Sequence, residues 1–355
     1  AGWQPQNGEP RVLPIYQSTT FKYSSTSEMA DLFDLKTSGY FYTRLANPTN
    51  DAVAQKICEL EGGVGATLTS SGQAANFFAV FNIWEAGGHI VTSNEIYGGT
   101  YNLFGVTLKK LGIECTMISP EATDEEIQAA IRPNTKLLFG ETITNPCCNV
   151  FDIERWANIA HKNGRPLIID NTFATPINCR PFEWGADIVV HSTTKYLDGH
   201  ATQVGGCVVD SGNFVWTQYP DKFPVLCTPD PSYHGLIYAE AFGKMGYTVK
   251  LVAQLMRDLG SIPSPHNSFL LNLGIETLHL RMPQHCSNAL KVAQFLSENP
   301  KVAWVNYPSL PGNINYQKAQ KYLPNGSCGV LSFGLKVDVE TAVKFMDSLK
   351  LIAIV

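Results

Sequence analysis

The sequence predicts an α/β domain with a mainly parallel sheet, followed by a smaller α+β domain. From about residue 48, short apolar β-branched runs alternate with longer amphipathic segments, which is the βαβα pattern of a parallel sheet. The runs are continuously apolar, and this indicates strands buried on both faces with helices above and below them. Beyond about residue 266 the alternation ends and long amphipathic segments dominate, so a second domain is expected there.

The first segment, residues 1–47, shows no clear periodicity, because three prolines and several glycines interrupt helix and strand alike. We expect it to form an arm that packs on another surface, such as a neighbouring subunit. A helix is predicted to follow Pro48, with Asn50 or Asp51 as its cap, and to stop at Gly62-Gly63.

Seven strands are predicted in the segment that follows this helix. Their ranges are 65–70, 89–93, 114–118, 136–141, 166–170, 188–191 and 204–209. The connecting helices are expected at 72–84 and 103–111, after a cap near Thr123, and from Asp152 to a stop at Gly164.

The second half of the chain is less regular. Residues 211–240 are rich in proline and aromatic residues and are predicted to form a long insertion, with a helix resuming near Tyr238. An amphipathic segment over 270–296 is expected to break at Pro283, and short strands are predicted at 302–307 and 329–335. The predicted division is an arm at 1–47, a cofactor-binding domain at 48–266 and a C-terminal domain at 267–355. The chain starts at Ala1 and stops in an apolar run, so we expect it to be cut short at both ends.

Composition argues against several classes of partner. The net charge is −5 and there is no basic block, so we expect no nucleic-acid binding. No apolar run reaches the length of about 18 residues that a membrane span needs. The nine cysteines are scattered without a C-x-x-C pair, which indicates reduced thiols in the cytoplasm and no metal site. No charged segment followed by an apolar one opens the chain, so no secretory signal is expected.

Chemically useful side chains follow the predicted strands, where ligands of parallel sheets bind. Lys195 stands beside the hydroxyls of Ser192–Thr194, and its amine can form an imine with a carbonyl. Asp170 ends another strand and can hold a protonated ring nitrogen, while Tyr97 can stack on a planar ring. Ser71-Gly72 opens a helix, where backbone N–H groups suit a phosphate. Together these parts match the needs of pyridoxal phosphate. Further polar residues at strand ends are Glu141 and Asn145.

Several segments, in their order along the chain, resemble the Cys/Met-metabolism family of pyridoxal phosphate enzymes. They are Tyr42-Thr43-Arg44, Asn47-Pro48-Thr49, Ser70-Ser71-Gly72, Tyr97-Gly98, Asp170-Asn171-Thr172 and Ser192-Thr193-Thr194-Lys195-Tyr196. Within the family, residues 95–104, 229–236 and 304–308 are most similar to O-acetylhomoserine sulfhydrylases. The resemblance implies the aspartate aminotransferase-like fold, known as fold type I.

The resemblance also implies roles for single residues. Lys195, Tyr97 and Asp170 would be catalytic: Lys195 would hold the cofactor as an imine, Asp170 would pair with the ring nitrogen, and Tyr97 would stack on the ring. Asn145 would approach the phenolic oxygen. The phosphate would be bound by Ser71, Gly72, Gln73, Ser192 and Thr194, and by Tyr42 and Arg44 across a dimer interface. Family members are commonly homotetramers of two such dimers, and the arginine that binds the substrate carboxylate would lie beyond residue 355.

The activity implied is a γ-replacement that converts O-acetyl-L-homoserine and sulfide, or methanethiol, to L-homocysteine, or methionine, and acetate. The alternatives are a cystathionine γ-synthase or a methionine or cystathionine γ-lyase of the same family. Gly99 argues against the methionine lyase, which carries a cysteine after the Tyr-Gly pair. A non-catalytic scaffold is disfavoured by Lys195 and Asp170, and a nicotinamide dehydrogenase by the missing G-x-G-x-x-G fingerprint.

Overall fold

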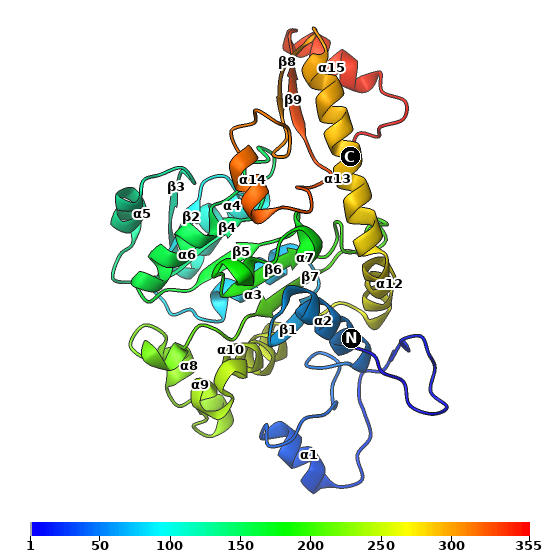
Figure 1. Cartoon of the computed structure of the whole chain (residues 1–355). Coiled ribbons are helices and arrows are strands. Elements are labelled where there is room, and N and C mark those ends of the chain that lie inside the picture. The colour runs from blue at the N-terminus through cyan, green and yellow to red at the C-terminus, as the bar shows by residue number, and fades with distance from the viewer. Residues whose placement is uncertain (1) are drawn as a thin grey trace.

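The computed structural model describes residues 2–355, so that Ala1 of the expected arm lies outside the described residues. A seven-stranded sheet forms the centre of the molecule, in the order β1-β7-β6-β5-β4-β2-β3 (Figure 1). The strands are β1 Gly65–Thr69, β2 His89–Ser93, β3 Glu114–Ile118, β4 Thr135–Glu141, β5 Leu167–Asp170, β6 Ile188–Ser192 and β7 Gly206–Asp210. The five strands from β6 to β3 are parallel, and β7 runs antiparallel to both of its neighbours. The predicted mainly parallel sheet is therefore confirmed.

Helices cover both faces of this sheet (Figure 1). On one face α3 (Gly72–Phe81) packs on β6 and β7, where Phe78 meets Val190 and Val208 in a buried core. On the other face lie α2 (Pro48–Glu61) and α6 (Ile153–Lys162), whose cores include the alternate strand residues Val189 and Ile169. This alternation follows from the two-residue period of a strand and shows that the sheet is buried on both sides.

The remaining helices of the first 260 residues are short. They are α1 Thr26–Phe33, α4 Gly98–Asn102, α5 Asp124–Ala130, α7 Thr175–Asn178, α8 Pro224–Cys227, α9 Tyr238–Ala241, α10 Gly246–Lys250 and α11 Arg257–Leu259. The predicted helix at 103–111 is instead a π-helical turn, Leu103–Thr107, followed by a 3₁₀ turn, Leu108–Leu111. None of the described helices is long and apolar enough to cross a membrane.

The C-terminal part is a smaller α+β unit. It contains α12 Pro265–Glu276, α13 Leu278–Glu298, β8 Val302–Asn306, α14 Tyr316–Tyr322, β9 Ser332–Leu335 and α15 Val339–Asp347. Strands β8 and β9 pair antiparallel, and α13 packs along β8 (Figure 1). The boundaries proposed for the three parts of the chain stay predictions.

Two local expectations were wrong. The long amphipathic segment breaks at Thr277 and not at Pro283, which lies inside α13. The buried face of α13, with Met282 and Cys286 on either side of Pro283, continues through the proline and outweighs the one lost hydrogen bond. The cap of α2 is Asn47, whose Oδ1 accepts from the Thr49 N–H at 2.9 Å, because Pro48 suits the first helical position.

The α12–α13 corner supports the turn that follows β6. Arg281 donates to the main-chain oxygens of Tyr196 at 2.9 Å and Gly274 at 2.8 Å. At Gly274 the helix approaches so closely that an added Cβ would lie 2.2 Å from the main-chain oxygen of Asp198. The position of this turn therefore depends on a glycine within a helix.

We expect G274A to lower the free energy of unfolding by about 1–3 kcal/mol, because the clash with backbone outweighs the better helix propensity of alanine. Urea unfolding of purified protein measures this change. G98A is the control, because a Cβ at that helical glycine meets nothing within 4 Å. Equal stability of the two variants would contradict the tight contact.

Candidate active site

A cavity of about 220 Å³ opens at the carboxyl ends of β4, β5 and β6. This is the edge where the ligands of parallel sheets bind. Its lining consists of Ser71, Gly72, Gln73, Asn76, Tyr97, Glu141, Ile143, Asn145, Asp170, Thr172, Phe173, Ser192, Thr194, Lys195 and Val204. All of the predicted site residues except Tyr42 and Arg44 are in this set.

Asp170 ends β5 and points into the cavity. Its Oδ1 accepts from the Thr172 main-chain N–H at 3.0 Å and from the Thr172 hydroxyl at 2.5 Å. Burial raises the pKa of the Asp170 carboxyl, and the Thr172 donors and the nearby His191 lower it part of the way. The two bonds from Thr172 favour an ionised carboxylate. Such a carboxylate can accept a hydrogen bond from a protonated ring nitrogen.

Glu141 lies beside Asp170 in the parallel register of β4 and β5 and is 4% exposed. Its two carboxyl oxygens accept from the main-chain N–H groups of Tyr97 at 2.7 Å and Asn145 at 3.3 Å. Burial and the neighbouring Asp170 raise the pKa of Glu141 well above its usual value. Burial and the neighbouring Asp170 therefore both favour the protonated form of Glu141.

Sequence reasoning placed Glu141 at a strand end but gave it no role. In the structure it anchors the two loops that carry Tyr97 and Asn145 to the rim of the cavity. The signal that could have found it is its position as the polar last residue of an apolar strand, the same signal that identified Asp170. Asn76 and Thr172 also line the cavity and were not among the predicted site residues.

Lys195 lies in the turn after β6 and lines the cavity. Within residues 2–355, its Nζ makes neither an ion pair nor a hydrogen bond to another side chain. The nearby Asp198 does not reach it, since both oxygens of that carboxylate are bonded within its own turn by Thr202, with His200 N–H donating at 3.1 Å. The amine is thus left for a ligand.

The start of α3 forms the other end of the cavity. Ser71 caps this helix, and its hydroxyl accepts from the Ala74 N–H at 3.1 Å. The N–H groups of Gly72 and Gln73 begin the helix, where the backbone favours an anion. An added Cβ on Gly72 would lie 2.6 Å from the Cβ of Ser192, so glycine allows α3 and β6 to meet here. This end suits a phosphate.

Tyr97 stands at the mouth of the cavity and is 49% exposed. Its ring lies so close to Gly99 that an added Cβ there would be 2.6 Å from the Cε1 of Tyr97. Next to this contact, the Gln73 side-chain amide donates a hydrogen bond to the Thr100 hydroxyl at 3.1 Å. Glycine at position 99 therefore leaves the room that the Tyr97 ring occupies at the edge of the cavity.

Tyr42 and Arg44 do not reach the cavity within one chain. They lie on the N-terminal arm, where the Arg44 guanidinium stacks over the Tyr42 ring at 4.9 Å. They line a different cavity together with α1 and residues 232–234 of the insertion. Their assignment to the phosphate of a neighbouring subunit stays a prediction.

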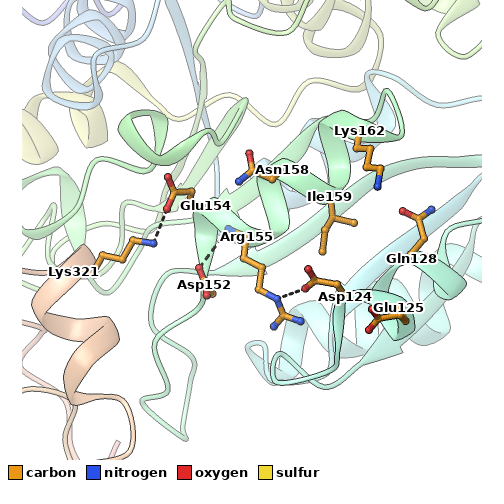
Figure 2. Close-up of a pocket in the computed structure, with 10 residues that line it drawn as sticks. All are labelled: Asp124, Glu125, Gln128, Asp152, Glu154, Arg155, Asn158, Ile159, Lys162 and Lys321. Atoms are coloured by element: carbon orange, nitrogen blue, oxygen red, sulfur yellow. Dashed lines mark hydrogen bonds and ion pairs between the residues drawn. The ribbon is translucent and has the colours of Figure 1, made fainter.

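A third cavity lies between α5, α6 and α14 and is lined mainly by charged side chains (Figure 2). These charges pair with one another: Arg155 binds Asp124 at 2.6 Å, and Lys321 binds Glu154 at 2.6 Å. Within residues 2–355, no group of three or more histidine, cysteine or acidic residues could hold a metal ion. These two ion pairs connect α5 to α6 and α6 to α14.

The profile of the family described as "Cys/Met metabolism PLP-dependent enzyme" matches residues 2–355. The homocysteine/cysteine synthase of Kluyveromyces lactis is 46% identical over 342 residues, which are 96% of this chain and 77% of that protein. The O-acetyl-L-homoserine sulfhydrylase of Leptospira meyeri is 44% identical over 353 residues, covering 97% and 79% of the two chains.

A solved structure from Campylobacter jejuni, of a protein named O-acetylhomoserine (thiol)-lyase, superimposes with a TM-score of 0.96 at 35% identity. The match covers 100% of this chain and 88% of that one, and the Campylobacter protein carries a pyridoxyl-lysine monophosphate residue. These likenesses bear out the predicted family and its fold type.

We expect G99A to weaken pyridoxal phosphate binding several-fold, because the added methyl group displaces the Tyr97 ring that would stack on the cofactor. Titration of cofactor-depleted protein, followed by tyrosine fluorescence, measures this affinity. G98A should bind as the wild type does, since its methyl group enters open space. Equal affinity of G99A and the wild type would exclude a role of the ring in binding.

Proposed function

Because the chain belongs to the family of Cys/Met metabolism PLP-dependent enzymes, we propose that its cavity binds pyridoxal phosphate and exchanges the γ-substituent of O-acetylhomoserine. The products are homocysteine and acetate when sulfide is the nucleophile, and methionine and acetate when methanethiol is. The observation that carries the proposal is the meeting of Lys195, Asp170 and the start of α3 in one cavity. The names of the relatives support this substrate.

The residues of the cavity fit the cofactor. Lys195 has an amine without a protein partner, and Asp170 presents a carboxylate for the ring nitrogen. Tyr97 would cover one ring face and Asn145 would approach the phenolic oxygen. The phosphate would be bound by Ser71, Gly72, Gln73, Ser192 and Thr194. When bound, pyridoxal phosphate supplies an electron sink for negative charge at the substrate Cα.

The side chains supply proton transfer and orientation for this exchange. Lys195 Nζ removes a proton from Cα and then one from Cβ. It later returns a proton to each of these carbons. Asp170, which Thr172 holds in place, keeps the proton on the ring nitrogen, and Tyr97 at the cavity mouth can serve as a proton partner. The Cγ–O bond to acetate breaks, and a Cγ–S bond to hydrosulfide forms.

Other members of the family are the nearest alternatives, and Gly99 bears on the choice. Its lack of a side chain lets the Tyr97 ring lie against the backbone, and the cysteine that the methionine lyase carries after the Tyr-Gly pair is missing. A cystathionine γ-synthase would use cysteine in place of sulfide. A non-catalytic scaffold would have no need of the unpaired Lys195 beside Asp170.

The arm bears on the assembly of the protein. Tyr42, at 36% exposure, and Arg44 lie outside their own chain's cavity, and we propose that they reach the phosphate of a second copy. The proposed unit is a dimer with shared sites, two of which form a tetramer. The proposed location is the cytoplasm, in keeping with the nine free cysteines.

An assay of the purified protein tests the reaction. O-acetylhomoserine with sulfide should give homocysteine and acetate, and neither O-acetylhomoserine with cysteine nor methionine alone should react well. K195A should lose this activity and the visible absorbance of the lysine-bound cofactor, whereas K162A, which changes an exposed lysine of the charged cavity, should keep both. Ketobutyrate formed from methionine without a thiol would indicate a lyase instead.

Mixing two variants tests the shared site. R44A and K195A should each have little activity, because each lacks one part of every site. Co-refolded or co-expressed together, they should recover up to about a quarter of the wild-type activity, since half of the random dimers contain one complete site. An absence of recovery, with mixed dimers shown by differently tagged chains, would mean that Arg44 acts within its own chain.

A further inference from the structure

A buried carboxylate–histidine pair lies on the face of the sheet opposite the cavity. His191 Nε2 and Glu61 Oε1 are 2.6 Å apart, and both residues are fully buried. Glu61 ends α2, while His191 lies on β6 between Val190, which faces α3, and Ser192, which lines the cavity. Because side chains alternate along a strand, His191 points to the α2 side.

The pair is unusual for a purely structural contact. Glu61 Oε2 and His191 Nδ1 are buried and have no hydrogen-bond partner among the described residues. Arg180 donates to the main-chain oxygen of Glu61 at 3.4 Å and not to its carboxylate. A buried ion pair of this kind costs free energy unless further hydrogen bonds compensate it. Its place behind the strand ends that carry Asp170 and Lys195 points to a role other than stability.

Hydrogen bonds connect Glu61 to Asp170 through Asn171. The Asn171 Nδ2 donates to Glu61 Oε1 at 2.8 Å, and its Oδ1 accepts from the Thr142 hydroxyl at 2.8 Å. Asn171 is fully buried and directly follows Asp170 in the chain. Glu61 therefore fixes the main chain on which the Asp170 carboxylate is carried.

A second connection runs through β6 and closes a ring. Ser192, next to His191, donates its N–H to the Thr172 hydroxyl at 2.8 Å, and that hydroxyl donates to Asp170 Oδ1. One carboxylate on α2 thus joins the ends of β5 and β6, which carry Asp170 and the turn to Lys195. The thiols of Cys58, Cys179 and Cys207 also lie on this face, and burial raises the pKa of each of them.

We propose that Glu61 and His191 are positioning residues, which act through the sheet to keep Asp170 aligned and ionised for the ring nitrogen of the cofactor. This inference rests on the proposed binding of pyridoxal phosphate. The His191 ring lies behind Asp170, whose pKa it lowers, and Glu61 holds that ring and Asn171 in place. When Glu61 loses its carboxylate, this support is lost, and the ring nitrogen of the cofactor loses an aligned anionic partner.

The experiment compares the holoenzyme of the wild type with E61Q, which keeps the shape of Glu61 but removes its charge. Nitrogen NMR of isotopically labelled pyridoxal phosphate reports the protonation of the ring nitrogen, and competition dialysis gives the cofactor affinity. We expect E61Q to shift the ring-nitrogen resonance toward the unprotonated form and to weaken the cofactor about tenfold, while E61D restores part of both. These readouts need no substrate, so they separate this inference from the proposed reaction.

The control is the pair His161–Asp187, which is 2.8 Å apart and ties α6 to the residue that precedes β6, at the end of that strand away from the cavity. Its buried Asp187 also accepts from the Leu167 N–H at 2.8 Å, so D187N should lower stability without moving the ring-nitrogen resonance. If E61Q does not fold, H191Q supplies the test, because it keeps a donor for Glu61 and removes the imidazole ring. A wild-type resonance and cofactor affinity in the folded variant would overturn the proposal.

Discussion

Two carboxyl groups, Glu141 and Asp170, meet side by side at the end of a buried parallel sheet, and the site is arranged around this contact. Two adjacent buried charges of the same sign cannot both be tolerated, so their proton affinities must differ. Each carboxyl group has two donors: Glu141 receives the main-chain N–H groups of the two rim loops, and Asp170 receives both donors of Thr172. Despite its donors, burial and Asp170 raise the pKa of Glu141 well above its usual value. The bonds to Glu141 also fix the loops that shape the cavity.

A single chain does not supply enough positive charge in the cavity to balance a bound phosphate. Lys195 is the lysine that lines it, and the start of α3 offers only partial positive charge, while a bound phosphate would add negative charge. The cation expected to meet that phosphate, Arg44, lies on the arm and outside the cavity. Assembly with a second copy would therefore complete the charge of the site as well as its shape, which gives a physical reason for a shared site.

The sequence was informative wherever one residue's environment is set by its immediate neighbours. Apolar runs predicted the strands, and the polar residues ending them predicted Asp170 and Lys195, because buried strands of a parallel sheet end at one edge. The sequence was uninformative where the local structure depends on packing against distant segments. Pro283 is tolerated through the packing of α13, the π-helical turn after Tyr97 has no periodic signal, and the meeting of Glu61 with His191 joins residues 130 positions apart.

The segment Asp170-Asn171-Thr172 shows how one short stretch serves both faces of the sheet. Asp170 and Thr172 line the cavity, and Asn171 between them binds Glu61 on the far side. Since successive side chains point in opposite directions, a change to Asn171 would act on the cofactor through the main chain without touching it. The chemistry of the cavity therefore depends on polar residues that a description of its lining alone would leave out.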